Sequence, residues 1–287
     1  MSAIEVDLRL RSPHWSRVTA SADTVNDGNG LWVRADHDCS DPTDPEVLAS
    51  HPGRLAAIQI DGDEVVLAQD RLRSWPLFWS LEDGVGGAQR LVISDDATLM
   101  REAVSTPRLD ARARREFLDA GFVTGSDTLL AGIHQTEQGT VVRIDRATGR
   151  VRTINHSLGR FSEETDTVVA PEDFSDLLTE ALDAVLGRLL VDLDRRPGTP
   201  RLVVPLSGGL DSRLLVAWLA LHDALDRTVA FTYGRPGARE VEISRKVAQA
   251  VGLEWHAVDY DPAVLREAWQ TQEAADFLTD GYALGAL

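Results

Sequence analysis

The sequence predicts two domains of different fold class: an α+β domain with antiparallel sheets, followed by an α/β domain with a doubly wound parallel sheet. In the first half, two apolar runs flank Asp61-Gly62-Asp63, and Asp-Gly between apolar runs is typical of a β-hairpin. From Arg201 onward, strand-like runs alternate with helix-like ones, as in sheets with crossover helices. The change of pattern indicates that the chain changes architecture near its middle.

Short strand-like segments make up the first half of the chain. They are "LWVRAD", "RLAAIQIDGDEVVLAQD", "QRLVISDD" and "GTVVRIDRATGRVRTIN". A second hairpin is expected at 146–149, where turn residues separate two alternating runs. One helix is expected over 110–120, with Asp110 as its N-cap. We assign residues 1–160 to this domain.

A polar stretch without periodicity, "GRFSEETDTVVAPEDFSD", places the domain boundary within 156–172. A helix is expected after it, because apolar residues recur at helical spacing. These residues are Phe174, Leu177, Leu178, Ala181, Leu182, Val185 and Leu189. The second domain is therefore assigned to residues 161–287.

Three strand–helix units are expected in the second domain. The strands are "RLVVPL", "TVAFTY" and "EWHAVDY", and the helices cover 212–224, 239–251 and a segment from Pro262. Gly252 lies where a C-terminal cap belongs, and Asp261 provides an N-cap before Pro262. Ligands of parallel sheets bind beyond the carboxyl ends of the strands, so the segment after "RLVVPL" is expected at the binding edge.

Composition excludes several function classes. The net charge is −17, whereas a nucleic-acid-binding protein needs a basic footprint, so no nucleic acid is expected as a partner. The longest apolar run, 214–221, is much shorter than the roughly 20 residues of a membrane span, and no secretory signal is visible. We therefore expect a cytoplasmic protein without a membrane partner.

The segment 207–212, "SGGLDS", has the composition of an anion-binding loop. Two glycines permit unusual backbone conformations and allow N–H groups to approach an anion, and the following helix directs its positive end toward the same place. The hydroxyl groups of Ser207 and Ser212 add donors. Asp211 would repel a phosphate unless a cation lay between them, which predicts Mg²⁺. A Walker-type loop is excluded because Gly-Lys-[Ser/Thr] is missing.

These residues resemble the ATP pyrophosphatases, and further stretches resemble the asparagine synthetase family in particular. "SGGLDS" after a strand is similar to the pyrophosphate-binding loop, and "FTYGRPGAREVEISRKVAQAVGLEWHAVDYD" and "QEAAD" are similar to later segments of the synthetase domain. In the first half, "DRLRSWPLFWS", "LVISDDATLM" and "TLLAGIHQTEQGTVVRID" resemble the back of that family's glutaminase domain. The resemblance covers roughly residues 50–287.

The resemblance implies a ligase that uses ATP to adenylate a carboxylate, releases pyrophosphate, and lets an amine attack to form an amide. It implies that the phosphates are held by Ser207, Gly208, Gly209, Leu210, Asp211 and Ser212. Pro205 and Tyr233 would line the adenosine pocket, Asp211, Glu240 and Asp276 would face Mg²⁺, and Glu273 would transfer a proton when the amine attacks.

Two departures from the family pattern limit this expectation. Residue 2 is Ser2 where glutamine-dependent members have a cysteine nucleophile, and the arginine and Asn-Gly-Glu elements find no match. We therefore expect the first domain to be a degenerate glutaminase-like remnant of the Ntn-hydrolase type, without glutaminase activity, as in β-lactam synthetases and lasso-peptide cyclases. The chain also stops at "GYALGAL", before the family's helical region with its lysines, so the second domain is expected to be partial.

The leading hypothesis is an ATP- and Mg²⁺-dependent carbon–nitrogen ligase of the asparagine synthetase type. Its substrates would be aspartate and ammonia, or another carboxylate and amine, and a homodimer is the candidate assembly. The alternative is a non-catalytic nucleotide-binding or interaction protein derived from a truncated synthetase. A different ATP pyrophosphatase, such as a tRNA-modifying enzyme, is disfavoured by the acidic charge and by the first domain.

The acidic excess predicts a halophilic protein. Lys246 is the only lysine among 29 basic residues, which a GC-rich genome would also explain, but such a genome does not explain 46 acidic residues. Self-repulsion at this charge is screened in molar salt. The folded fraction, followed by circular dichroism, should therefore rise between dilute buffer and molar KCl. Complete folding in dilute buffer would contradict a halophilic origin.

Overall fold

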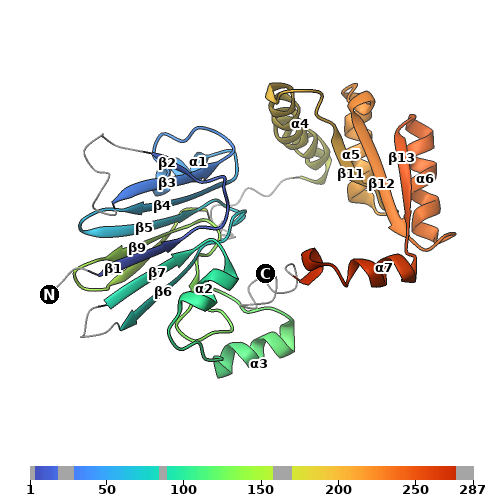
Figure 1. Cartoon of the computed structure of the whole chain (residues 1–287). Coiled ribbons are helices and arrows are strands. Elements are labelled where there is room, and N and C mark those ends of the chain that lie inside the picture. The colour runs from blue at the N-terminus through green and yellow to red at the C-terminus, as the bar shows by residue number, and fades with distance from the viewer. Residues whose placement is uncertain (1–3, 19–28, 84–88, 158–169, 276–287) are drawn as a thin grey trace. The chain divides into compact units, whose positions relative to one another are not determined.

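The computed structural model describes residues 4–18, 29–83, 89–157 and 170–275. The chain divides into two compact units (Figure 1). Unit 1 comprises Met1–Arg160 together with Gln272–Leu287, and unit 2 comprises Phe161–Thr271.

A six-stranded antiparallel sheet forms one layer of unit 1, in the strand order β10-β9-β5-β4-β3-β2. Its strands are β2 (Ser16–Val18), β3 (Gly30–Ala35), β4 (Leu55–Ile60), β5 (Glu64–Gln69), β9 (Thr140–Asp145) and β10 (Val151–Asn155). Both predicted hairpins are confirmed, because β4 pairs with β5 and β9 pairs with β10. In the first turn Asp61 accepts hydrogen bonds from two backbone N–H groups, and in the second Gly149 has a φ of 71°, which favours glycine.

A four-stranded sheet with the order β1-β7-β6-β8 forms the other layer. Its strands are β1 (Glu5–Arg9), β6 (Phe78–Asp83), β7 (Gln89–Ser94) and β8 (His134–Gln135). The expectation of antiparallel sheets is wrong for one pair, since β1 runs parallel to β7 with Glu5 opposite Arg90. No hairpin turn joins these two strands, so the local sequence does not dictate their direction.

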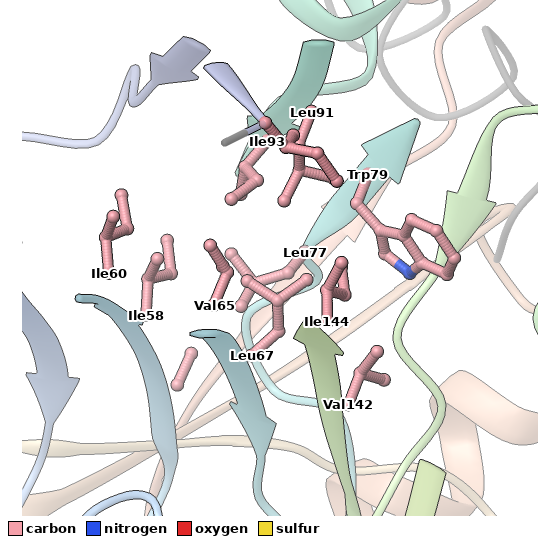
Figure 2. Packing of buried hydrophobic residues seen from close by; sticks show 12 residues of the cluster. Ile58, Ile60, Val65, Leu67, Leu77, Trp79, Leu91, Ile93, Val142 and Ile144 are labelled. Carbon is pink, nitrogen blue, oxygen red and sulfur yellow. The ribbon is translucent and has the colours of Figure 1, made fainter. Parts of the chain in front are cut away.

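The main hydrophobic core of unit 1 joins residues of both sheets. Alternate residues of β4 and β5, including Ile58, Ile60, Val65 and Leu67, pack with Leu91 and other buried residues of the second sheet (Figure 2). Successive side chains of a strand point to opposite faces, so each strand contributes every second residue to this core. The alternating pattern of the sequence therefore determines which face of each sheet is buried.

Three helices of unit 1 share one kind of N-terminal cap. They are α1 (Pro45–Ser50), α2 (Ala97–Ala103) and α3 (Ala111–Ala120). Each follows an aspartate whose carboxylate accepts a backbone N–H of the first turn, and the predicted helix with Asp110 as its cap is confirmed as α3.

Unit 2 alternates helices with parallel strands. Its elements are α4 (Pro171–Arg195), β11 (Leu202–Pro205), α5 (Leu210–Leu221), a short 3₁₀ turn (Leu225–Arg227), β12 (Thr228–Gly234), α6 (Arg239–Val251), β13 (Glu254–Asp259) and α7 (Pro262–Ala268). The three predicted strands are present and pair in parallel in the order β11-β12-β13. Helix α6 has the predicted bounds, whereas α5 begins two residues before the predicted start, after Gly209 as its N-cap, and ends at Leu221, three residues before the predicted end.

The three strands of this sheet lie in sequence order, so the strands of the described part of unit 2 do not include the reversal that defines a doubly wound sheet. The core contains Val204 and Ala230 of the sheet together with Val216 of α5 and Ala248 of α6. Alternate strand residues are exposed, among them Val203 and Tyr233. The sheet is therefore covered by helices on one face.

No helix within the four described stretches of the chain is long and apolar enough to cross a membrane.

Asp70 is the buried acceptor on which the loop after β5 depends. Its carboxylate accepts the backbone N–H groups of Leu55 at 2.9 Å and Leu72 at 2.7 Å. Replacing Asp70 by alanine would leave the buried N–H of Leu55 without this partner, and we expect the free energy of unfolding to fall by about 2–3 kcal/mol. Urea unfolding of the Asp70→Ala variant measures this.

The matched control is Asp61→Ala, which also removes two hydrogen bonds to backbone N–H groups but on an exposed turn. Water replaces the lost acceptor there, so a loss of about 1 kcal/mol or less is expected. Equal decreases in the free energy of unfolding of the two variants would show that the buried carboxylate of Asp70 contributes no more than an exposed turn aspartate.

Candidate anion-binding site in unit 2

The loop "SGGLDS" lies at the carboxyl end of β11. Leu206 is buried and donates its N–H to the carbonyl of Phe231, which keeps it beside β12. The chain leaves the sheet at Ser207, and α5 starts at Leu210. The loop therefore occupies the place where parallel sheets bind their ligands.

The two serines hold the loop by hydrogen bonds within it. The Ser212 hydroxyl accepts the N–H of Ser207 at 3.0 Å and lies 3.0 Å from the Ser207 hydroxyl. The Ser207 hydroxyl also accepts the N–H of Gly209 at 3.1 Å. Ser212 is buried beneath the loop, whereas Leu210 is three-quarters exposed. The serines thus shape the loop as well as supplying polar groups to it.

The N-terminus of α5 has no side-chain cap. Gly209 occupies the N-cap position, and among the residues that the structure describes no side chain caps the first turn. The first N–H groups of a helix have no partner inside the helix and carry its positive partial charge. An N-terminus of this kind binds an anion readily, and a chain of phosphates is such an anion.

Gly208 and Gly209 contribute to the loop because they have no side chain. Neither Gly208 nor Gly209 has a positive φ, so the expectation that they provide unusual backbone conformations is wrong. A Cβ on Gly208 would lie 3.5 Å from Ile243 of α6, and one on Gly209 would lie 3.2 Å from the Ser207 hydroxyl. Their value is that no side chain stands between the backbone and an approaching ligand.

Two carboxylates stand at helix N-termini of this unit. Asp211 is in the first turn of α5 and Glu240 is in the first turn of α6, and both are exposed. Within the described part of the chain neither carboxylate has a hydrogen-bond or ion-pair partner. Both helices begin after the carboxyl ends of parallel strands, so the two N-termini belong to one edge of the sheet.

No three His, Cys, Asp or Glu side chains of the described stretches converge as a metal site. Mg²⁺ does not need such a cage, because proteins usually bind it through one or two carboxylates plus water and phosphate oxygens. The two free carboxylates therefore fit Mg²⁺ that arrives with a nucleotide, and they do not fit a preformed metal centre.

Aromatic residues adjoin the loop on the exposed face of the sheet. Pro205 pairs in register with Phe231, whose ring centroid lies 6.3 Å from that of Tyr233, and Tyr233 lies 5.6 Å from Tyr260. Tyr233 is 57% exposed. Aromatic rings that are accessible from solvent can stack on a nucleobase, which is the contact expected of Tyr233 if it lines an adenosine pocket.

The remaining predicted residues lie elsewhere. Glu273 is exposed in the helical turn 272–275, which belongs to unit 1 by its contacts, while Asp276 and Ser2 lie outside the described residues. The structure thus brings together the loop, Glu240, Pro205 and Tyr233 within unit 2. It does not bring Glu273 together with them in one unit.

Sequence reasoning missed a buried polar residue directly beneath the loop. Thr232 of β12 lies between apolar residues at an inward position, and its hydroxyl is 2.6 Å from the carbonyl of Leu206. The sequence did indicate a buried hydrogen bond here, because a threonine at an inward position of a strand needs a hydrogen-bond partner for its hydroxyl. Its partner was not predictable from the local sequence.

Comparison with known proteins places the similarity in this same region. The family model described as "Queuosine biosynthesis protein QueC" matches residues 201–276. A 7-cyano-7-deazaguanine synthase of Bacteroides fragilis is 39% identical over 57 residues, which are 20% of this chain and 26% of the relative. One of Acinetobacter baylyi is 36% identical over 67 residues, or 23% and 28%.

Two solved structures have low similarity to the chain. Glutamine-dependent NAD⁺ synthetase from Acinetobacter baumannii, in complex with ADP, is 15% identical, with 61% of this chain and 36% of that chain covered and a TM-score of 0.27. Glutamine phosphoribosylpyrophosphate amidotransferase from B. subtilis, with ADP and GMP, is 12% identical, with 91% and 76% covered and a TM-score of 0.24. These scores are too low to bear on the fold.

The chain spans about a quarter of the length of the curated relatives it matches. The C-terminal region is similar to a QueC-type PP-loop domain of the ATP-pyrophosphatase kind, and these matches do not show an asparagine synthetase. The alternative that the acidic charge and the first domain disfavour, an ATP pyrophosphatase outside the asparagine synthetase family, therefore has sequence support over residues 201–276.

Proposed function

We propose that unit 2 binds MgATP at the loop 207–212 and serves an ATP-dependent ligase that activates a carboxylate for attack by an amine. The observation that carries this proposal is the uncapped N-terminus of α5 behind "SGGLDS" at the carboxyl edge of a parallel sheet. The QueC match to residues 201–276 supports the same region and the same use of ATP.

The phosphates would be held by the first N–H groups of α5 and by the backbone N–H groups of Gly208 and Gly209. The Ser207 hydroxyl would be a further donor. When a carboxylate attacks the α-phosphate, the bond to the β-phosphate breaks and negative charge develops on the departing pyrophosphate. Fixed N–H groups aimed at this charge stabilise the transition state more than the ground state.

Asp211 and Glu240 would hold Mg²⁺, with Asp276 as a third carboxylate. The cation would neutralise charge on the phosphate oxygens and allow a carboxylate to stand beside them. Tyr233 and Pro205 would border the adenosine. Glu273 would take the proton of the attacking amine.

The finer assignment is an amide-forming reaction of the asparagine synthetase type, with aspartate and ammonia, or another carboxylate and amine, as substrates. The match to 7-cyano-7-deazaguanine synthases favours a second candidate, a ligase that acts on a 7-deazaguanine carboxylate, inferred from that printed product name and from the carboxylate activation proposed above. Pyrophosphate release measured with each carboxylate in turn, with and without ammonia, separates the two. ATP binding without turnover by any carboxylate would favour the non-catalytic alternative.

The role of Asp211 can be tested by calorimetric titration of MgATP into the wild type and the Asp211→Ala variant. Loss of a carboxylate that faces the metal should weaken binding about tenfold or more, which corresponds to about 1.4 kcal/mol or more. Pyrophosphate should compete with MgATP in the wild type.

Asp226→Ala is the matched control, because Asp226 is an exposed aspartate of the same unit, located in the 3₁₀ turn at the amino end of β12. We expect its MgATP affinity to stay within twofold of the wild type. If both variants bind equally well, Asp211 does not face the metal, and if the folded wild type binds no MgATP, the proposed function is wrong.

A further inference from the structure

A buried hydrogen-bond network lies beneath the loop, centred on the hydroxyl of Thr232. Thr232 is 5% exposed, and its hydroxyl lies 2.6 Å from the carbonyl oxygen of Leu206, the residue before Ser207. This contact fixes the peptide group from which the loop departs. A displacement of that carbonyl would move Ser207, whose N–H and hydroxyl organise the rest of the loop.

The same hydroxyl contacts α6 through Ser244, in the second turn of the helix. It lies 2.7 Å from the hydroxyl of Ser244, which is fully buried and lies 2.9 Å from the carbonyl of Val241. Val241 directly follows Glu240 in the chain. Thr232 therefore connects the start of the loop, which leads to Asp211, with the turn that bears Glu240.

A third contact comes from β13. The indole N–H of Trp255 donates to the Thr232 hydroxyl at 2.9 Å. Each hydroxyl has a single proton, so Thr232 donates either to the Leu206 carbonyl, its shortest contact, or to Ser244, and Ser244 donates either to Thr232 or to the Val241 carbonyl. The Trp255 N–H donates to Thr232 in every case. The Thr232 hydroxyl thus has hydrogen-bonding partners on three other segments of the chain.

We infer that Thr232 is a positioning residue, which holds the loop 207–212 and the first turn of α6 at the spacing that binding of a magnesium-bound pyrophosphate group requires. This inference rests on the proposed function. Removal of the hydroxyl would leave the Leu206 carbonyl and the Trp255 N–H without this partner in a buried place. The loop would then relax away from the geometry at which its N–H groups converge.

Thr228 provides a matched control in the same strand. It lies on the same face of β12, is fully buried, and donates its hydroxyl proton to the carbonyl of Ala224 at 2.7 Å. It is located at the amino end of the strand, away from the loop. Thr228→Val and Thr232→Val therefore remove the same group from similar surroundings and differ in what the hydroxyl contacts.

The experiment combines hydrogen exchange of peptides spanning 205–213 with calorimetric titration of magnesium pyrophosphate. We expect Thr232→Val to accelerate exchange in this segment at least fivefold and to lower pyrophosphate affinity about tenfold. Thr228→Val should change the exchange rate and the pyrophosphate affinity by less than twofold each, with a melting temperature similar to that of Thr232→Val. Thr232→Ser, which keeps the hydroxyl, should restore affinity to within threefold of the wild type.

Equal effects of the two valine variants, or unchanged exchange in Thr232→Val, would overturn the inference. If the wild type binds no pyrophosphate but Thr232→Val selectively accelerates loop exchange, the positioning role stands and the proposed function falls. If Thr232→Val does not fold, Ser244→Ala takes its place, because it removes one arm of the network. It should accelerate loop exchange and weaken binding about threefold, and wild-type behaviour in both would overturn the inference.

Discussion

The uncapped N-terminus of α5 is the feature on which the candidate site depends. Parallel pairing of β11 with β12 places this N-terminus at the carboxyl edge of the sheet, and Gly209 at the N-cap leaves its first N–H groups without a side-chain partner. Helices α1, α2 and α3 of unit 1 show the opposite arrangement, since an aspartate caps each of them. An anion that binds α5 would complete a helix end that the protein itself leaves open.

Attraction at this helix end has to overcome the charge of the whole molecule. With a net charge of −17, the protein repels a polyanion such as ATP at long range. Two exposed carboxylates beside the loop add to this repulsion unless a divalent cation accompanies the phosphates. The site is thus suited to a magnesium-bound nucleotide, and salt would assist the encounter because it screens the long-range field over about 10 Å at 0.1 M.

Local signals in the sequence predicted the elements whose conformation is set locally. The turns at Asp61 and Gly149, the cap at Asp110 and the bounds of α6 depend on neighbouring residues and were predictable. The parallel pairing of β1 with β7 was not, since it joins residues more than 80 positions apart. The hydroxyl network of Thr232 was hidden for the same reason, because its partners come from three other segments.

The most direct test of the central claim is to follow the backbone amide resonances of the protein during titration with magnesium pyrophosphate. If phosphates bind at the uncapped N-terminus of α5, the largest chemical-shift changes should occur at the amides of Gly208 to Ser212. These changes should reach a plateau as magnesium pyrophosphate is added. Smaller shifts should follow in the first turn of α6. Shifts confined to other parts of the chain, or none at all in the folded protein, would contradict the account.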